Sequence, residues 1–200
     1  MSAPLIFHFD FSSPYGYLAS TKIDALGARH GRDVIWKPFL IGATLKVTGL
    51  PVLMEVPLKG DYSRHDFARS ARFHGVSYNH PDPFPISTQA PARAFYWVAA
   101  QDPVRAKQLA VALLQAYFVE GINISNPADT VAVAKGLGHD AAALEAALND
   151  PAVKALLKNE VDAAMAKGVF GSPFVFVDGE PFWGIDRFDQ IERWLATGGF

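Results

Sequence analysis

The sequence has 200 residues, half of them apolar, and a formal net charge of −2. This length is enough for one well-buried core with a sizeable insertion, and the lack of a basic run excludes the electrostatic footprint of a nucleic-acid-binding protein. The chain contains no cysteine, which excludes disulfides, thiolate metal sites, cysteine nucleophiles and dithiol redox chemistry.

The first forty residues predict a strand, a helix and a second strand. Polar and apolar residues alternate in PLIFHFDF (4–11), as in a strand with one apolar face. Ser13 is a candidate N-cap, and Pro14 suits the first position of a helix that runs to Gly31. RDVIWKPF (32–39) alternates again. Strand, helix and strand in this order form a βαβ unit with parallel strands.

The middle of the chain is expected to be helical. Glycines and prolines interrupt residues 40–57, which predict a loop, or a short helix followed by a loop. A helical pattern then runs from Asp61 to Gly75, and a proline-spaced extended loop follows. Five alanine-rich helical segments fill residues 89–168, bounded by Asp, Asn, Pro or Gly. We interpret residues 41–166 as an all-helical insertion that also carries the substrate loop.

The last forty residues return to an α/β pattern. PFVFV (173–177), an Asp178-Gly179 turn and a second short strand predict a hairpin, and Asp186 can cap the final helix. The order βαβ, helical insertion, ββα predicts an α/β protein with a thioredoxin-like fold. In this interpretation residues 1–40 and 167–200 form the thioredoxin-like domain.

Four segments carry a resemblance to a known family. They are FDFSSPYGYLA (9–19), LKVTG (45–49), KGDYSRHDFARSARFHGV (59–76) and GVFGSPFVFVDGEPFWGIDRF (168–188). In this order and spacing the chain resembles the 2-hydroxychromene-2-carboxylate isomerases and the kappa-class glutathione transferases, which belong to the DsbA-like branch of thioredoxin folds. Dithiol members of that branch have Cys-x-x-Cys where this chain has SPYG, so Ser13 stands in place of the first cysteine.

The resemblance implies glutathione as the cofactor, a cytoplasmic homodimer, and Ser13 as the catalytic residue beside the glutathione sulfur. The cofactor-binding residues that it implies are Ser13, Ser172, cis-Pro173, Trp183, Gly184, Ile185 and Asp186. Lys46 and Phe84 would bind an aromatic or unsaturated carboxylate substrate. Family isomerases tend to have asparagine at the position of Ile185, and a polar residue, often asparagine, at that of Leu50. The substrate loop is therefore expected to be more apolar here.

The residues around Ser13 also suit a thiolate on physical grounds. The first turn of a helix presents unpaired N–H groups and the positive end of the helix dipole. Lowering the pKa of a thiol from about 8.5 by roughly 2 units raises its ionised fraction roughly 25-fold, but the accompanying loss of nucleophilicity leaves only about a two- to threefold gain. Positioning of the sulfur therefore contributes more to the rate. No neighbouring base is evident, so Ser13 is expected to donate a hydrogen bond rather than act as a nucleophile.

The implied reaction is addition of a thiolate to an activated carbon–carbon double bond, rotation about the resulting single bond, and elimination of the thiolate. Lys46 would pair with the substrate carboxylate or stabilise the enolate that forms on addition. Two alternatives stay open. A kappa-like glutathione transferase would leave glutathione on the product, and a noncatalytic thioredoxin-fold module would only bind.

Several residues keep a second interpretation. Ser13 also fits a plain N-cap, Lys46 a solvated lysine, and Asp186 a helix cap that needs no ligand. Asp10 is either buried and hydrogen-bonded or close to the site. The six histidines lack the spacing of metal ligands, so no metal site is expected. No window approaches 18 uncharged apolar residues, and a cytoplasmic protein without a membrane partner is expected.

Overall fold

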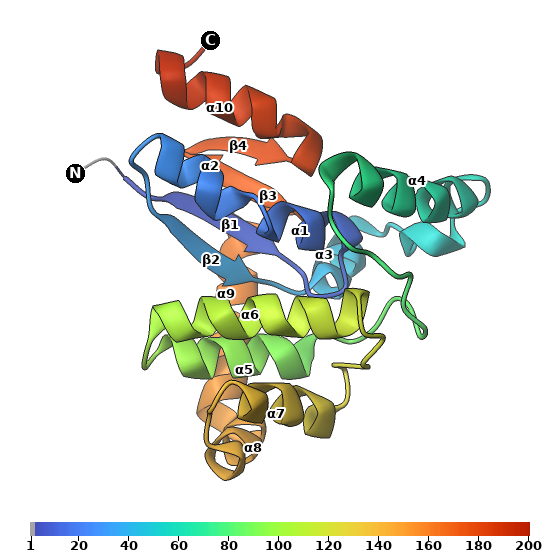
Figure 1. The fold of residues 1–200 in the computed structure, drawn as a ribbon, viewed down its shortest axis with the longest axis vertical. Coiled ribbons are helices and arrows are strands. Elements are labelled where there is room, and N and C mark those ends of the chain that lie inside the picture. The colour runs from blue at the N-terminus through green and yellow to red at the C-terminus, as the bar shows by residue number, and fades with distance from the viewer. Residues whose placement is uncertain (1–2) are drawn as a thin grey trace.

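The computed structural model describes residues 3–200, which form a four-stranded mixed sheet with helices on both sides (Figure 1). The strands are β1 (Leu5–Phe9), β2 (Val34–Pro38), β3 (Phe174–Val177) and β4 (Glu180–Trp183), in the spatial order β2-β1-β3-β4. β1 is parallel to β2 and antiparallel to β3, and β3 is antiparallel to β4. The predicted βαβ…ββα arrangement of a thioredoxin-like fold is confirmed.

The single helix expected between β1 and β2 is in fact two short ones, α1 (Pro14–Ser20) and α2 (Ile23–Arg29). Thr21 follows the last residue of α1, and its hydroxyl donates to the Leu18 carbonyl, as the Ser20 hydroxyl does to the Tyr17 carbonyl. Side-chain hydroxyls that bond nearby carbonyls in this way compete with helical hydrogen bonds and favour a break. The sequence prediction of one continuous helix was therefore wrong.

The segment after β2 contains α3 (Ile41–Thr48), a 3-10 turn η1 (Leu53–Glu55) and α4 (Lys59–His74). The predicted short helix is α3, which ends at Gly49 in the left-handed conformation. α4 begins two residues earlier than expected, because the loop before it turns tightly at Leu58. Gly75 ends α4 as predicted, also in the left-handed conformation.

All five helices expected in the insertion are present within residues 89–166. They are α5 (Gln89–Ala99), α6 (Pro103–Phe118), α7 (Pro127–Gly136), α8 (Ala141–Asn149) and α9 (Pro151–Ala166). Asp102, Asn126 and Asp150 each cap a helix that begins with proline, and their side-chain oxygens accept backbone N–H bonds of the first turn.

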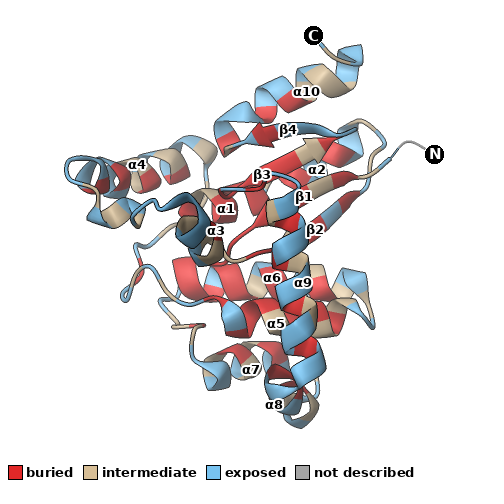
Figure 2. Ribbon diagram, turned by 180° about the vertical axis from the view of Figure 1, so that it is seen from behind, coloured by how far each residue is buried: buried red, intermediate tan, exposed pale blue. Residues whose placement is uncertain are grey.

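The insertion and the sheet share one hydrophobic core (Figure 2). Phe9 on β1 packs edge-on against Phe95 on α5, with ring centroids 6.4 Å apart. The Tyr96 hydroxyl donates to the Pro38 carbonyl at 2.7 Å. α9 carries the chain back from the insertion to β3, as Figure 1 shows. The helical part therefore packs on the sheet rather than standing apart from it.

The C-terminal end has a 3-10 turn η2 (Ile185–Arg187) followed by α10 (Phe188–Thr197). The expectation that Asp186 caps this helix was wrong. Arg187 occupies the N-cap position, and no side chain caps it, because η2 already forms the turn in which a cap would stand. Nowhere in residues 3–200 is a helix both long enough and apolar enough to cross a membrane.

Candidate functional site

A large cleft of about 1950 Å³ lies where the loop after β1 meets α3, α4 and the segments around β3 and β4. Most of the predicted site residues line this cleft: Ser13, Lys46, Phe84, Ser172, Trp183, Gly184, Ile185 and Asp186. Pro173 is buried behind the wall, and its carbonyl accepts the Gly184 N–H at 3.0 Å. The fold thus brings together residues that are up to 173 positions apart in the sequence, the separation of Ser13 and Asp186.

Ser13 is held at the start of α1 by two hydrogen bonds. Its Oγ accepts the Gly16 N–H at 3.0 Å, which confirms the predicted N-cap, and donates to the Ser172 carbonyl at 3.1 Å. The residue is only 6% exposed, yet it borders the cleft. A hydroxyl that is fixed in place on a cleft wall can offer its proton to a ligand by rotation of the O–H bond alone.

The Ser172–Pro173 bond is cis, as the resemblance implies. Ser172 has two contacts with the loop after β1, because its Oγ accepts the Asp10 N–H at 3.0 Å and its carbonyl accepts from Ser13. Among the described residues the Ser172 N–H makes no backbone hydrogen bond. A Cβ at Gly16 would lie 2.5 Å from Ser172 Oγ. The close packing of α1 against this loop therefore requires glycine at position 16.

Asp10 proves to be both buried and close to the site, two possibilities that the sequence left open. Its carboxylate accepts from the Ser12 N–H (2.7 Å), the Ile41 N–H (2.8 Å) and the Thr88 hydroxyl (3.2 Å). Burial raises the pKa of Asp10 to about 6, against the opposing effect of these hydrogen bonds. One carboxylate therefore ties the loop before α1 to the starts of α3 and α5.

The segment from Trp183 to Asp186 forms one rim of the cleft. Trp183 is 55% exposed and packs against Phe170, with ring centroids 4.8 Å apart. Gly184 has a φ of 106°, which side chains rarely adopt, and the Asp186 carboxylate folds back towards it. The Asp186 side chain is itself solvent-exposed, whereas Ile185 is buried in the core. Ile185 thus contributes to the core more than to the substrate loop.

Lys46 and Leu50 lie on the opposite side of the cleft. Lys46 is exposed in the last turn of α3, and no carboxylate of residues 3–200 forms an ion pair with it. Leu50 is 62% exposed on the loop that follows. Lys59 also lines the cleft, from the first position of α4. This side combines two cations with an apolar surface.

Phe84 lies in the extended loop between α4 and α5. Its ring packs against His80 and Phe67, with centroid distances of 4.9 and 6.0 Å. The loop is joined to the start of α1 by the Ile86 N–H, which donates to Ser12 Oγ at 3.0 Å. Ser12, which the sequence suggests to be a loop residue, therefore connects the Phe84 loop to the Ser13 loop.

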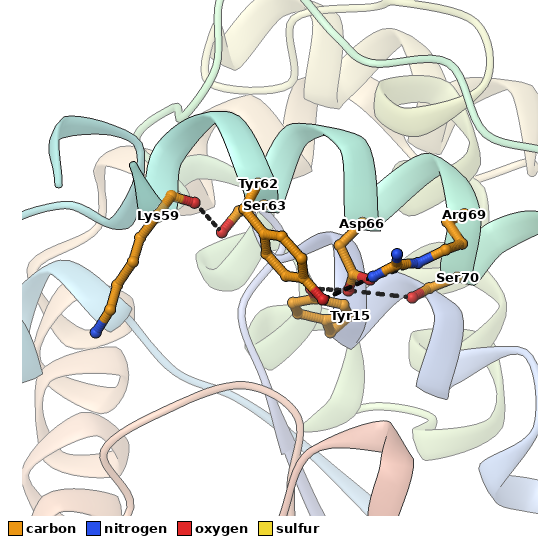
Figure 3. A network of polar contacts seen from close by, with 7 residues as sticks. All are labelled: Tyr15, Lys59, Tyr62, Ser63, Asp66, Arg69 and Ser70. Atoms are coloured by element: carbon orange, nitrogen blue, oxygen red, sulfur yellow. Dashed lines mark hydrogen bonds and ion pairs between the residues drawn. The ribbon is translucent and has the colours of Figure 1, made fainter. Parts of the chain in front are cut away.

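A polar network that joins Tyr15 on α1 to residues of α4 was not predicted from the sequence (Figure 3). The Tyr15 hydroxyl donates to Asp66 Oδ2 at 2.5 Å, and Arg69 forms an ion pair with the same carboxylate. Ser70 Oγ donates to Asp66 at 3.3 Å, and Arg69 also donates to the Tyr62 hydroxyl. Both Tyr15 and Asp66 line the cleft. The i,i+3 and i,i+4 spacing of Asp66, Arg69 and Ser70 was a signal of this cluster.

The histidines do not assemble a metal site. Within residues 3–200 no group of three or more His, Asp or Glu side chains is placed to hold a metal ion. His8 is buried on β1, packs edge-on against Phe39 and Phe176, and neither of its ring nitrogens has a hydrogen-bond partner. Burial, with the charge of Lys37, lowers the pKa of His8 to about 4, so the ring is neutral at physiological pH.

Comparisons with known proteins agree with this fold. The family model of the DSBA-like thioredoxin domain matches residues 4–196. A 2-hydroxychromene-2-carboxylate isomerase from Sphingobium xenophagum is 32% identical over 202 residues, which cover 98% of this chain and 99% of the relative. Glutathione S-transferase kappa 2 from Caenorhabditis elegans is 26% identical over 95% of this chain and 90% of the relative.

The solved structures give the same result. The structure of a 2-hydroxychromene-2-carboxylate isomerase superposes with a TM-score of 0.86 at 25% identity, and the match covers 96% of this chain and 94% of that one. A probable DsbA oxidoreductase from Streptomyces coelicolor shares the fold, with a TM-score of 0.78 at 20% identity over 98% and 91% of the two chains.

Proposed function

We propose, because the chain belongs to the 2-hydroxychromene-2-carboxylate isomerase family of DSBA-like thioredoxin domains, that it is a glutathione-dependent cis–trans isomerase of this type. The observation that carries the proposal is the position of Ser13. In a chain without cysteine, its hydroxyl stands on the cleft wall at the start of α1, beside the cis Ser172–Pro173 bond.

Bound glutathione would supply a thiolate that adds reversibly to a double bond and leaves unchanged. Ser13 would donate its proton to the sulfur instead of to the Ser172 carbonyl, while its Oγ continues to cap α1. The Ser172 N–H, which makes no backbone hydrogen bond in the described residues, would bind a carbonyl of the tripeptide backbone. The exposed carboxylate of Asp186 is available for the α-amino group of the γ-glutamyl end.

The substrate would lie between these residues and the opposite side of the cleft. Lys46 would pair with its carboxylate, or stabilise the enolate that develops when the double bond is attacked. Leu50 and Phe84 offer apolar surface to an aromatic ring. With these roles, the proposed substrate is an aromatic or otherwise unsaturated carboxylate. Glutathione would act catalytically and would not be consumed.

The decisive experiment is to assay cis–trans isomerisation of an arylidene pyruvate with and without 1 mM glutathione, on the order of a cellular concentration. We expect turnover that needs glutathione but does not consume it. The Ser13→Ala variant should lose about 10- to 100-fold in turnover, since a hydrogen bond to a charged group contributes about 1.5–3 kcal/mol. Wild-type activity in this variant would contradict the role of Ser13.

Asn126→Ala is a matched control, because Asn126 also caps a helix that begins with proline and does not line the cleft. Both variants should lose about 1 kcal/mol of stability from the missing cap, but only Ser13→Ala should lose turnover. Equal loss of activity in the two variants would assign Ser13 to folding alone.

The kappa-class relative makes a glutathione transferase the second candidate. In that case glutathione would remain on the product, and mass spectrometry would detect a stable conjugate in place of the trans isomer. A noncatalytic module would show neither. A specific glutathione site should stabilise the fold by roughly 2.7 kcal/mol at about a hundred times the dissociation constant, so an unchanged melting temperature would contradict both enzymatic proposals.

The oligomeric state and the cellular compartment of the protein also belong to this proposal. We expect a homodimer, which light scattering after size exclusion would test, and a cytoplasmic protein, which cell fractionation would test. A monomer with full isomerase activity would leave the mechanism intact, because every residue assigned above belongs to one chain.

A further inference from the structure

Tyr15 is a cleft residue that the proposed mechanism does not use. It stands on α1, two positions after Ser13, and its half-buried ring packs edge-on against Phe67, with a centroid distance of 5.1 Å. Figure 3 shows its hydroxyl directed at the Asp66 carboxylate on α4. A tyrosine whose ring is fixed from one side and whose hydroxyl is fixed from another presents a defined oxygen to the cleft.

Asp66 determines whether the Tyr15 hydroxyl donates or accepts a hydrogen bond towards the cleft. Burial alone would raise the pKa of Asp66, but the hydrogen bonds that its carboxylate accepts from Tyr15, Arg69 and Ser70, together with the Arg69 charge, lower it below its usual value. Asp66 is therefore ionised and takes the single hydroxyl proton of Tyr15. The phenol oxygen can then only accept from a ligand, and its bond to a carboxylate makes it a stronger acceptor.

We infer that Tyr15 recognises a hydroxyl group on the substrate and that Asp66 is the positioning residue that holds Tyr15 in the accepting orientation. This inference deepens the proposed function and rests on it. The relatives' substrate, by its name, carries a hydroxyl and a carboxylate on one carbon. Tyr15 provides an acceptor for the first group, and Lys46, which lines the same cleft, provides a cation for the second.

The rival explanation is structural, since the Tyr15–Asp66 bond also joins α1 to α4. A structural role would affect all substrates equally, whereas a recognition role would affect only those with a hydroxyl. The test therefore compares two substrates, of which only one can present a hydroxyl and a carboxylate on the same carbon. These are cis-2-hydroxybenzylidene pyruvate, which closes to the hydroxychromene, and cis-benzylidene pyruvate, which cannot.

We expect the wild-type protein, assayed with glutathione, to favour the hydroxylated compound in kcat/KM by about tenfold, the effect of one well-oriented hydrogen bond. Tyr15→Phe should reduce this preference to about one, because kcat/KM should fall much further for the hydroxylated compound than for the unsubstituted one. Asp66→Ala should also reduce it, because the Tyr15 hydroxyl then loses the acceptor that fixes its orientation.

Tyr62→Phe is the matched control, because Tyr62 belongs to the same network through Arg69 but does not line the cleft. It should keep the wild-type preference. An unchanged preference in Tyr15→Phe, or an equal loss for both compounds, would overturn the inference and leave the isomerase proposal standing. If wild-type protein and glutathione isomerise neither compound, the proposed function itself fails.

Discussion

The two sides of the cleft are built in different ways. The proposed glutathione wall is made of the loop after β1, the Ser172–Pro173 loop and Trp183–Asp186, and its first two parts are buried and closely packed, with Ser172 only 7% exposed. The proposed substrate wall, made of α3, η1 and the start of α4, is more open, with Leu53 42% exposed. A Cβ at Gly16 in the first wall would lie 2.5 Å from a neighbouring oxygen, whereas one at Gly42 in the second would meet no atom within 4 Å.

This difference indicates in which part of the site the positions of the binding groups must be fixed. The glutathione wall would hold one invariable ligand, and its hydroxyls and backbone groups are fixed by hydrogen bonds from segments far apart in the chain. The substrate wall has few such bonds, so its side chains can change without disturbing the first wall. We therefore expect substitutions in the glutathione wall to affect folding and catalysis together, and those in the substrate wall to affect substrate choice.

The largest expected effect concerns the two buried polar residues at the C-terminal end of β1. Asp10, behind the glutathione wall, has a raised pKa of about 6, so its burial costs stability above that pH and the cost disappears as pH falls towards 4. His8 has a lowered pKa of about 4, so its stability contribution is present above pH 6.5 and is lost as pH falls to 4.

On going from neutral pH to pH 4, we therefore expect Asp10 to raise the free energy of unfolding and His8 to lower it, each by on the order of 3 kcal/mol. Relative to wild type, His8→Leu should gain stability as pH falls from 6.5 to 4, and Asp10→Asn should lose it. Urea unfolding at half-unit pH intervals measures both. Parallel curves for the three proteins would show that neither group has a shifted pKa in the folded state.

The next effect is expected for Gly16→Ala in the glutathione wall. The new methyl group would collide with Ser172 Oγ and crowd Ser13, which should cost about 1–3 kcal/mol and lower isomerase activity. Gly42→Ala in the substrate wall is the control, and it should gain up to about 1 kcal/mol because alanine favours the helix. Equal changes in melting temperature for both variants would contradict the contrast between the walls.

A smaller effect of the opposite sign is expected for Leu58, in the loop that joins η1 to α4 beside the substrate wall. Its φ of 67° and ψ of −44°, with the Lys59 N–H donating to the Pro57 carbonyl at 2.8 Å, make a strained γ-turn. Leu58→Gly should relieve about 1 kcal/mol of this strain and raise the melting temperature. Leu58→Ala, which keeps the strain and removes the exposed side chain, is the control, and it should leave the melting temperature unchanged.

The smallest effect is expected for Lys46→Gln. An exposed ion pair contributes about 0.2–1 kcal/mol, so kcat/KM for a carboxylate substrate should fall about two- to fivefold, with no change in stability. The carboxamide analogue of the substrate serves as the control, since it carries no charge. If both compounds lose activity equally, Lys46 acts on the enolate rather than on the carboxylate.

Much of the fold could be predicted because its signals are local. Alternating residues marked β1 and β2, and Ser13-Pro14 marked the start of α1 and of the site. The errors arose where two local signals compete. Thr21 breaks a helix that the apolar spacing would continue, and η2 forms the turn in which Asp186 was expected to act as a cap.

The sequence by itself determined the order of the elements, the absence of a thiol and the candidate residues around Ser13, because these depend on residue types and short spacings. Only the tertiary structure decided that Asp10 lies behind the site and that Tyr15 meets Asp66. The Asp10 contacts join residues 31 and 78 positions apart, and the Tyr15–Asp66 contact joins residues 51 positions apart. Their energies come from burial and from donors on other elements. No local pattern encodes such distances, since they arise only when the sheet and the insertion pack together.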